Sequence, residues 1–209
     1  RTAGHKVGAE VFRKIATHCK ELGVEYLTVY AFSTENWKRP ADEVNTIMGL
    51  LKQYMLEAID SMERDQIRLR FLGDLSAISP ELQALVDRTN EISTHIHGFQ
   101  ANVCLNYGGR EEILHAARRF ARDCADGIAD PDSLTEAGFS DYLYSAGIPD
   151  PELIIRTSGE ERLSGFLLWQ CAYSEFYFCD TLWPDFDARA LDKAIIAYQS
   201  RDRRFGGVK

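Results

Sequence analysis

Residues 153–178 read LIIRTSGEERLSGFLLWQCAYSEFYF, and this stretch decides the fold class. Its first three residues form a short, β-branched apolar run, which is typical of a buried strand. Polar residues follow at once, then an apolar segment at 166–173 that we interpret as helical, and a second strand-like run at 176–178. A polar loop at the carboxyl end of a buried strand is where open α/β sheets bind their ligands. The stretch therefore predicts both a sheet and a binding loop.

The loop after this strand has the chemistry of an anion site. Arg156 and Arg162 carry permanently charged guanidinium groups that suit phosphate oxygens. The loop also offers three hydroxyl donors and two glycines that let backbone amides approach an anion: Thr157, Ser158, Ser164, Gly159 and Gly165. A helix starting near Ser164 would add its positive amino end. A single arginine would favour a solvated loop with a structural salt bridge, but this combination within ten residues favours the anion site.

Glu175 is the one acid in the apolar run 173–178. An unpaired carboxylate is costly in apolar surroundings. We expect a metal ion or an arginine as its partner.

Composition restricts the function classes. A chain of 209 residues fits a single domain over residues 1–209. Its net charge of −8 argues against a nucleic-acid partner, which would need a basic face. Five scattered cysteines without a Cys-x-x-Cys pair predict reduced thiols in a cytoplasmic protein. No apolar run approaches membrane-spanning length.

The rest of the chain alternates between helices and strands. Helical periodicity predicts helices at 4–22, 41–63, 80–96, 110–124, 134–146 and from 187 towards 201, and β-branched or alternating runs predict strands at 26–32, 67–72 and 99–105. This order predicts an α/β fold with a mostly parallel central sheet flanked by helices. Polar residues follow Phe32, Leu105 and Ile155, so three strand ends can share one rim.

Several ordered motifs resemble the cis-prenyltransferases, typified by undecaprenyl diphosphate synthase. They are YAFSTENWKRP at 30–40, NYGGR at 106–110, IRTSGEERLS at 155–164, FLLWQ at 166–170, LWPDF at 182–186 and RRFGG at 203–207. The resemblance covers essentially the whole chain. The family's Asp-Gly-Asn-Gly-Arg-Trp motif, with an Mg²⁺-binding aspartate and the strand before it, is expected upstream of Arg1. Glu161 and Gly165 depart from residues that are common in the family.

The resemblance implies Mg²⁺-dependent condensation of isopentenyl diphosphate with an allylic diphosphate, such as farnesyl diphosphate. The product would be a long-chain polyprenyl diphosphate, the undecaprenyl carrier of cell-wall synthesis, and the growing chain would lie in an apolar tunnel. The family also implies a homodimer in the cytoplasm that touches the inner face of the membrane to deliver product. One alternative is a non-catalytic partner subunit of a heteromeric cis-prenyltransferase. Another is an unrelated phosphate-binding α/β enzyme, although no Walker-type loop is present.

The resemblance also implies individual roles. Asn36 would accept or relay a proton, since a neutral amide is a poor base. Glu175 would hold Mg²⁺. Substrate contacts would come from Arg1, His5, Ser33, Thr34, Glu35, Trp37, Arg39, Arg156, Arg162, Leu163 and Ser164. The tunnel would be lined by Ala31, Met48, Phe99 and Val103. Three alternatives remain open. Asn36 could simply form a turn, Trp37 could simply pack the loop, and the predicted helix at 41–63, which contains Met48, could be ordinary core.

Overall fold

The computed structural model describes the backbone of residues 2–202 and the side chains of residues 7–202. Its helices and strands follow one another along the chain as α1 (Thr2–Glu21), β1 (Tyr26–Ser33), η1 (Thr34–Lys38), α2 (Ala41–Asp65), β2 (Arg68–Leu72), η2 (Leu75–Ala77), α3 (Pro80–Ser93), β3 (Gln100–Tyr107), α4 (Gly109–Ala125), η3 (Pro131–Ser133), α5 (Glu136–Ser140), β4 (Leu153–Arg156), β5 (Glu175–Phe178), η4 (Trp183–Asp185) and α6 (Ala188–Gln199), where η denotes a 3-10 helix. The predicted α/β alternation is confirmed.

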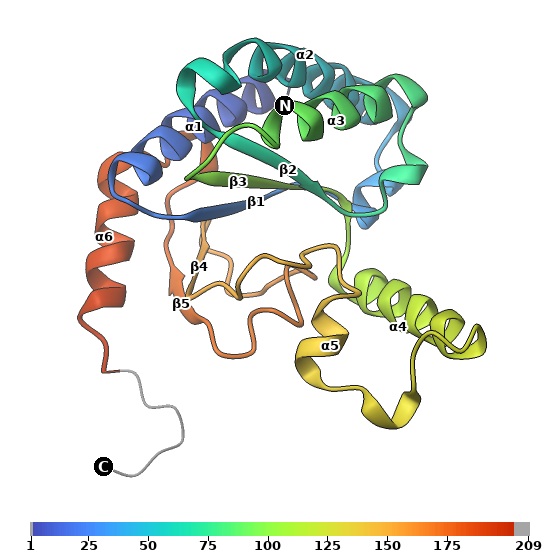
Figure 1. Cartoon of the computed structure of the whole chain (residues 1–209). Coiled ribbons are helices and arrows are strands. Elements are labelled where there is room, and N and C mark those ends of the chain that lie inside the picture. Colours follow the sequence, from blue (N-terminus) through green and yellow to red (C-terminus); the bar gives the residue numbers. More distant parts are fainter. Residues whose placement is uncertain (1, 203–209) are drawn as a thin grey trace.

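The strands form two parallel sheets. One has the order β1-β3-β2 and the other pairs β4 with β5. Figure 1 shows α1, α2 and α3 together on one side of the three-stranded sheet, with β4, β5, α4 and α5 on the other. Strand β3 is central and every one of its residues is buried, as a strand covered on both faces should be.

Alternate residues of the three-stranded sheet face two different cores. Phe71, Val103 and Leu105 pack against α2 and α3, in a cluster that includes Val44, Met55 and Val86. Leu72 and Cys104 face the other way and pack against Ile154, Leu167 and Cys171. The period of two in the strands thus divides the apolar side chains between helices above and loops below.

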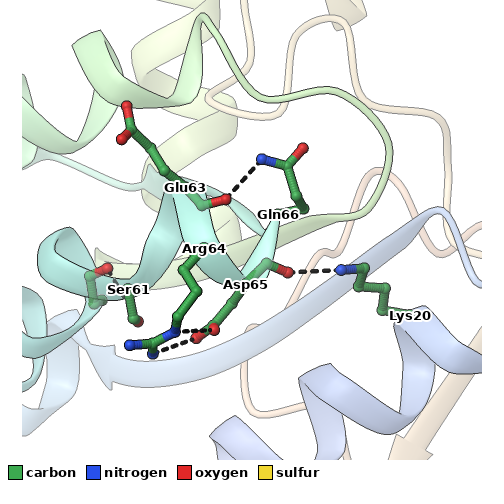
Figure 2. A network of polar contacts seen from close by, with 7 residues as sticks. Lys20, Ser61, Glu63, Arg64, Asp65 and Gln66 are labelled. Carbon is green, nitrogen blue, oxygen red and sulfur yellow. Dashed lines mark hydrogen bonds and ion pairs between the residues drawn. The ribbon is translucent and has the colours of Figure 1, made fainter.

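The helix ends follow from local sequence. Ser79 accepts a hydrogen bond from the Leu82 N–H at 3.4 Å, and Pro80 opens α3. Asp187 caps α6 by accepting from the Ala190 N–H at 2.9 Å, as predicted. At the end of α2, Gln66 takes the left-handed conformation and its side chain donates to Glu63 O at 2.7 Å (Figure 2).

The same helix end is tied to α1. Lys20 at the end of α1 donates to Asp65 O at 2.6 Å, and Arg64 pairs with the Asp65 carboxylate at 2.9 Å (Figure 2). A lysine is well placed there because the last carbonyls of a helix lack intrahelical donors.

Two predicted helices are wrong. Residues 166–173 form consecutive turns, and the helix predicted at 134–146 is reduced to Glu136–Ser140. Left-handed backbone at Gly165 and Leu167 interrupts the first segment. In the second segment, the Tyr144 N–H donates to Glu112 Oε1 at 2.9 Å. The Arg70 guanidinium donates hydrogen bonds to the carbonyl oxygens of Tyr144 and Ala146. Tertiary hydrogen bonds thus replace the helical ones.

Within the described residues, no helix has both the length and the apolar character needed to cross a membrane.

Candidate active site

The loops that follow β1, β3 and β4 meet at one rim. A Cβ on Gly108, at the end of β3, would come within 2.6 Å of Thr34 Oγ1 at the end of β1. The Gly109 N–H, which opens α4, donates to Gly165 O in the loop after β4 at 2.7 Å. The absence of side chains at both glycines permits these close approaches.

The loop that follows β1, residues 33–39, is held by its own polar groups. Asn36 Oδ1 accepts from the Ser33 N–H at 2.9 Å, so Asn36 closes a turn. Trp37 packs edge-to-face on buried Phe32, with ring centroids 5.0 Å apart. Its Nε1 donates to Asn106 Oδ1 at 2.7 Å. Local packing by Asn36 and Trp37 is therefore present, whatever further role these residues have.

The remaining predicted substrate contacts of this loop differ in exposure. Ser33 and Thr34 are half-buried, whereas Glu35 and Arg39 are exposed. Arg39 pairs with Glu43 at 2.7 Å, one turn into α2. This pair holds the guanidinium at the start of α2, next to the loop.

The loop after β4 presents Arg156 at its start. Arg156 is half-buried and its Nε is buried with no hydrogen-bond partner among the described residues. A buried donor without an acceptor is costly, so this guanidinium is suited to an anionic ligand. Arg162 is exposed and pairs with Glu160 of the same loop.

The backbone of this loop differs from the expected anion cradle. The Ser158 and Gly159 amides donate to Thr181 O and Cys179 O, both at 2.9 Å, so these amides are already used. The helix expected to begin near Ser164 is replaced by turns, which removes its dipole from the site. Ser158 and Ser164 have positive φ angles of 71° and 51°. Non-glycine residues in this conformation cluster at functional sites.

The other two predicted substrate contacts of this loop, Leu163 and Ser164, differ in solvent exposure. Leu163 packs on the cluster that includes Ile154 and Leu167. Ser164 is exposed. Leu163 thus anchors the loop while its neighbour faces outward.

Glu175 lies at the opposite end of the β4–β5 pair from Arg156. Leu153 is its register partner, whereas Arg156 pairs with Phe178, so about 10 Å of strand separates the two side chains. Glu175 Oε2 accepts from Arg201 Nη1 at 2.6 Å. Of the two partners expected from the sequence, the structure shows the arginine.

The described residues contain no cluster of three or more histidine, cysteine, aspartate or glutamate side chains that could hold a metal ion. Glu175 by itself does not fit as a complete Mg²⁺ site, because Mg²⁺ requires octahedral oxygen ligation.

A buried polar network supports the rim from below. Glu112 of α4 is fully buried and accepts from Tyr107 Oη at 2.5 Å, Gln170 Nε2 at 3.0 Å and the Tyr144 N–H at 2.9 Å. Gln170 also donates to Ser145 Oγ at 2.8 Å. Burial, followed by the Glu112 charge, raises the pKa of Tyr107 well above its ordinary range. The network ties the segment carrying Ser164 and Gly165 to α4.

The predicted tunnel residues fall into three environments. Met48 and Val103 lie in the cluster between the sheet and α2 and α3. Phe99 lies in a second cluster, with Ile15 of α1, before the amino end of β3. Ala31 is exposed, at an irregularity in the pairing of β1 with β3. These side chains lie in separate packing environments, and the tunnel stays a prediction.

Two predicted contacts fall outside the described residues. Arg1 is not described, and for His5 only the backbone, within α1, is described. Asn106 is a residue that sequence reasoning missed as a site component. Its place directly before two glycines, at the polar end of a buried strand, was the available signal.

Comparison with known proteins identifies the family. Residues 1–206 match the family model described as "Putative undecaprenyl diphosphate synthase". The chain belongs to this prenyltransferase family. An isoprenyl transferase of Clostridium perfringens is 48% identical over 209 residues, covering 100% of this chain and 83% of that protein. One of Prochlorococcus marinus is 45% identical over 208 residues, covering 100% of this chain and 78% of that protein.

Solved structures of prenyl diphosphate synthases have the same fold. Lavandulyl diphosphate synthase from Lavandula x intermedia, in complex with dimethylallyl diphosphate, has a TM-score of 0.94 at 34% identity, covering 99% of this chain and 89% of that one. A "probable undecaprenyl diphosphate synthase" from Campylobacter jejuni has a TM-score of 0.84 at 34% identity, covering 97% and 93%. The predicted family and fold are confirmed, and this member of the undecaprenyl diphosphate synthase family is a prenyltransferase enzyme. The comparisons give no support to the non-catalytic subunit.

Proposed function

We propose that this enzyme condenses isopentenyl diphosphate with an allylic diphosphate, in an Mg²⁺-dependent reaction, to make a long-chain polyprenyl diphosphate. One observation supports the proposal above the others. Arg156, whose buried Nε has no hydrogen-bond partner among the described residues, ends β4, and the loop that follows it reaches Gly109, next to the loop of Asn36 and Trp37. A diphosphate held by the loop after β4 would lie next to the loop that orients its hydrocarbon part.

The reaction forms one carbon–carbon bond and breaks one carbon–oxygen bond. The diphosphate of the allylic substrate leaves with the electron pair of the C–O bond, the allylic carbon bonds to the isopentenyl carbon, and a proton leaves the isopentenyl carbon skeleton. Arg156 and Arg162 would bind the isopentenyl diphosphate through charge-assisted hydrogen bonds, with Ser164 adding a hydroxyl donor. Holding the reacting carbons together in this way supplies a large part of such rate enhancements.

Asn36 is suited to relaying the proton rather than holding it. Its Oδ1 already accepts from the Ser33 N–H at 2.9 Å, and a neutral amide is a poor base. A water molecule or the released diphosphate would be the final acceptor. Ser33, Thr34, Glu35, Trp37 and Arg39 would form the wall of this site.

Mg²⁺, when bound, would neutralise diphosphate charge. The described residues of one chain do not assemble its ligands. Glu175 remains the proposed carboxylate, and it would have to leave Arg201 to serve there. Its separation from Arg156 favours action at another chain's site, which is a reason to propose a homodimer.

We also propose the finer assignments that the family relationship suggests. The product would be the undecaprenyl carrier of cell-wall synthesis, released by a cytoplasmic enzyme that touches the inner face of the membrane. Met48, Phe99, Val103 and Ala31 would line the path of the growing chain, and Arg1 and His5 would contact the allylic diphosphate.

The test uses the purified full-length gene product with Mg²⁺, farnesyl diphosphate and labelled isopentenyl diphosphate. We expect a ladder of products ending at a long polyprenol, and no incorporation in the presence of EDTA. Arg156→Lys keeps the charge but loses the planar guanidinium that can bind two phosphate oxygens at once. It should raise KM for isopentenyl diphosphate at least about tenfold. Lack of incorporation by the folded wild-type protein would contradict the proposal and return attention to a non-catalytic subunit.

A further inference from the structure

Asn106 is the junction of three segments at the rim. It is the seventh residue of β3, is only 4% exposed and has a φ angle of 47°. Its side chain accepts from Trp37 Nε1 at 2.7 Å and donates to Asp74 O at 2.8 Å. Its backbone carbonyl accepts from the Asp74 N–H at 3.2 Å. One buried residue therefore bonds the loop after β1 to the loop after β2.

The two sides of this junction differ in rigidity. On the β2 side, two hydrogen bonds link Asn106 to Asp74, and the backbone at Gly73 is so close that an added Cβ would lie 2.0 Å from Leu105 O. That side is backbone packed on backbone. On the β1 side, Trp37 is 42% exposed and is held by the single indole hydrogen bond and by its contact with Phe32.

The position of Trp37 sets the position of its neighbours. Trp37 lies within η1, a helix of five residues, and the adjacent Asn36 closes the turn onto Ser33. A short 3-10 helix has weak internal hydrogen bonds, so an external anchor has a large share in holding it. The left-handed backbone of Asn106 is tolerated because asparagine visits this region more readily than other side-chain-bearing residues.

We infer that Asn106 is a positioning residue. Its amide fixes the Trp37 indole, and through it the loop at residues 33–39, against the rigid end of β3. The inference deepens the proposed function, since this loop is proposed to orient the isopentenyl group. Asn106 touches no substrate in this assignment and acts only through Trp37.

The first test needs no activity. Exchange of the indole N–H groups with solvent is measured by NMR on the full-length protein, and Trp37→Phe assigns the Trp37 signal. We expect the Trp37 indole to be protected in wild type and to exchange about tenfold faster in Asn106→Gly, since one hydrogen bond is lost. Glycine accepts the positive φ angle, so only the side chain is removed. Fast exchange in wild type would overturn the inference without any variant.

The second test uses kinetics. Asn106→Gly and Trp37→Phe should each raise KM for isopentenyl diphosphate about tenfold, while KM for the allylic diphosphate changes by less than about twofold. If Asn106 acts through Trp37, the double variant is no worse than the more affected single variant. If the KM increases of the two single variants multiply in the double variant, the two residues act independently and the inference is overturned.

Asn102→Ala is the matched control. Asn102 is a second buried asparagine of β3, and its amide donates to Thr28 Oγ1 at 3.1 Å, away from the rim. It should lower stability while leaving Trp37 exchange and both KM values unchanged. If Asn102→Ala shifts KM as Asn106→Gly does, general loosening explains both and the inference fails. If no form of the enzyme turns over, the proposed function fails, and the exchange experiment still decides the role of Asn106.

Discussion

Neighbouring carboxylates on α4 have different surroundings. Glu112 is fully buried and has three donors. Glu111 is partly buried and, among the described residues, accepts from Tyr144 Oη alone, at 3.2 Å to each oxygen. Burial, together with the charges of Asp74 and Glu112, raises the pKa of Glu111 above 4.5, against the opposing effects of Tyr144 and His115. The Glu111 carboxylate is thus the less well satisfied of the two.

This raised pKa predicts a pH dependence of stability. Above pH 4.5, the unfolded chain releases the Glu111 proton before the folded chain does, so the free energy of unfolding falls as pH rises through this window. Glu111→Gln should remove that component, and its stability relative to wild type should increase from pH 4 to pH 7 by urea denaturation. Tyr144→Phe, which removes the hydrogen bond that lowers the Glu111 pKa in the folded state, should extend the window to higher pH. A stability difference between Glu111→Gln and wild type that does not change with pH would contradict the assignment.

At the scale of elements, the contact between α4 and the loop after β4 leaves no room for a side chain. A Cβ on Gly109 would lie 2.6 Å from Gly165 O and 2.7 Å from Leu168 Cγ. Backbone cannot move away as a side chain can, so Gly109→Ala must displace the segment that carries Ser164. We expect a loss of about 1–3 kcal/mol in stability and a raised KM for isopentenyl diphosphate.

The control for this substitution is Gly49→Ala. Gly49 lies within α2 and an added Cβ meets nothing within 4 Å. Alanine favours the helix by about 1 kcal/mol, so Gly49→Ala should be more stable than wild type with unchanged KM. Urea denaturation and steady-state kinetics on both variants give the comparison. Equal effects of the two alanines would show that the Gly109 contact is unimportant.

The elements that could be predicted from the sequence are those held by local signals. The strands and the long helices lie within three residues of their predicted bounds, because the hydrophobic period and helix caps such as Asp187 specify them. The segment 166–173 could not be predicted. Its apolar run suits a helix, but Gly165 and Leu167 are left-handed and Gln170 is held by buried Glu112. Tertiary contacts decided its conformation.

The candidate site was predictable in its residue types and less so in its geometry. The approach of the polar loops after β1 and β3 followed from the parallel strands of one sheet, whereas β4 lies in a second sheet. The use of the Gly159 amide by Cys179 O, and the distance of Glu175 from Arg156, depend on where β5 pairs. The hydrogen bond of Asn106 with Trp37 depends on how the loop containing Trp37 lies beside β3. The geometry of the site therefore depends on contacts between segments that are far apart in the chain, which local sequence patterns do not specify.

For the whole molecule, the parallel strands separate two regions. The rim lies at their carboxyl ends, and β3, with eight residues, places Phe99 about 25 Å away at the other end. There, a surface hollow of about 400 Å³ lies beside Phe99 and Tyr26. Phe99 is 5% exposed and also belongs to the core cluster with Ile15 and Ile96. Phe99 thus belongs to the core and also lines that hollow.

This placement carries the prediction about product length. If the growing chain extends from the rim towards the amino ends of the strands, Phe99→Ala removes the ring that blocks it, and the products become longer. The variant should also lose about 3–5 kcal/mol of stability, since a buried aromatic ring is deleted. Ile96→Ala, in the same cluster and 2% exposed, should lose about 2–5 kcal/mol without lengthening products, because Ile96 does not line the hollow. Chain lengths of extracted polyprenols and urea denaturation separate the two effects. An unchanged distribution with Phe99→Ala would show that the chain ends elsewhere, whereas lengthening by both variants would assign the change to a loosened core.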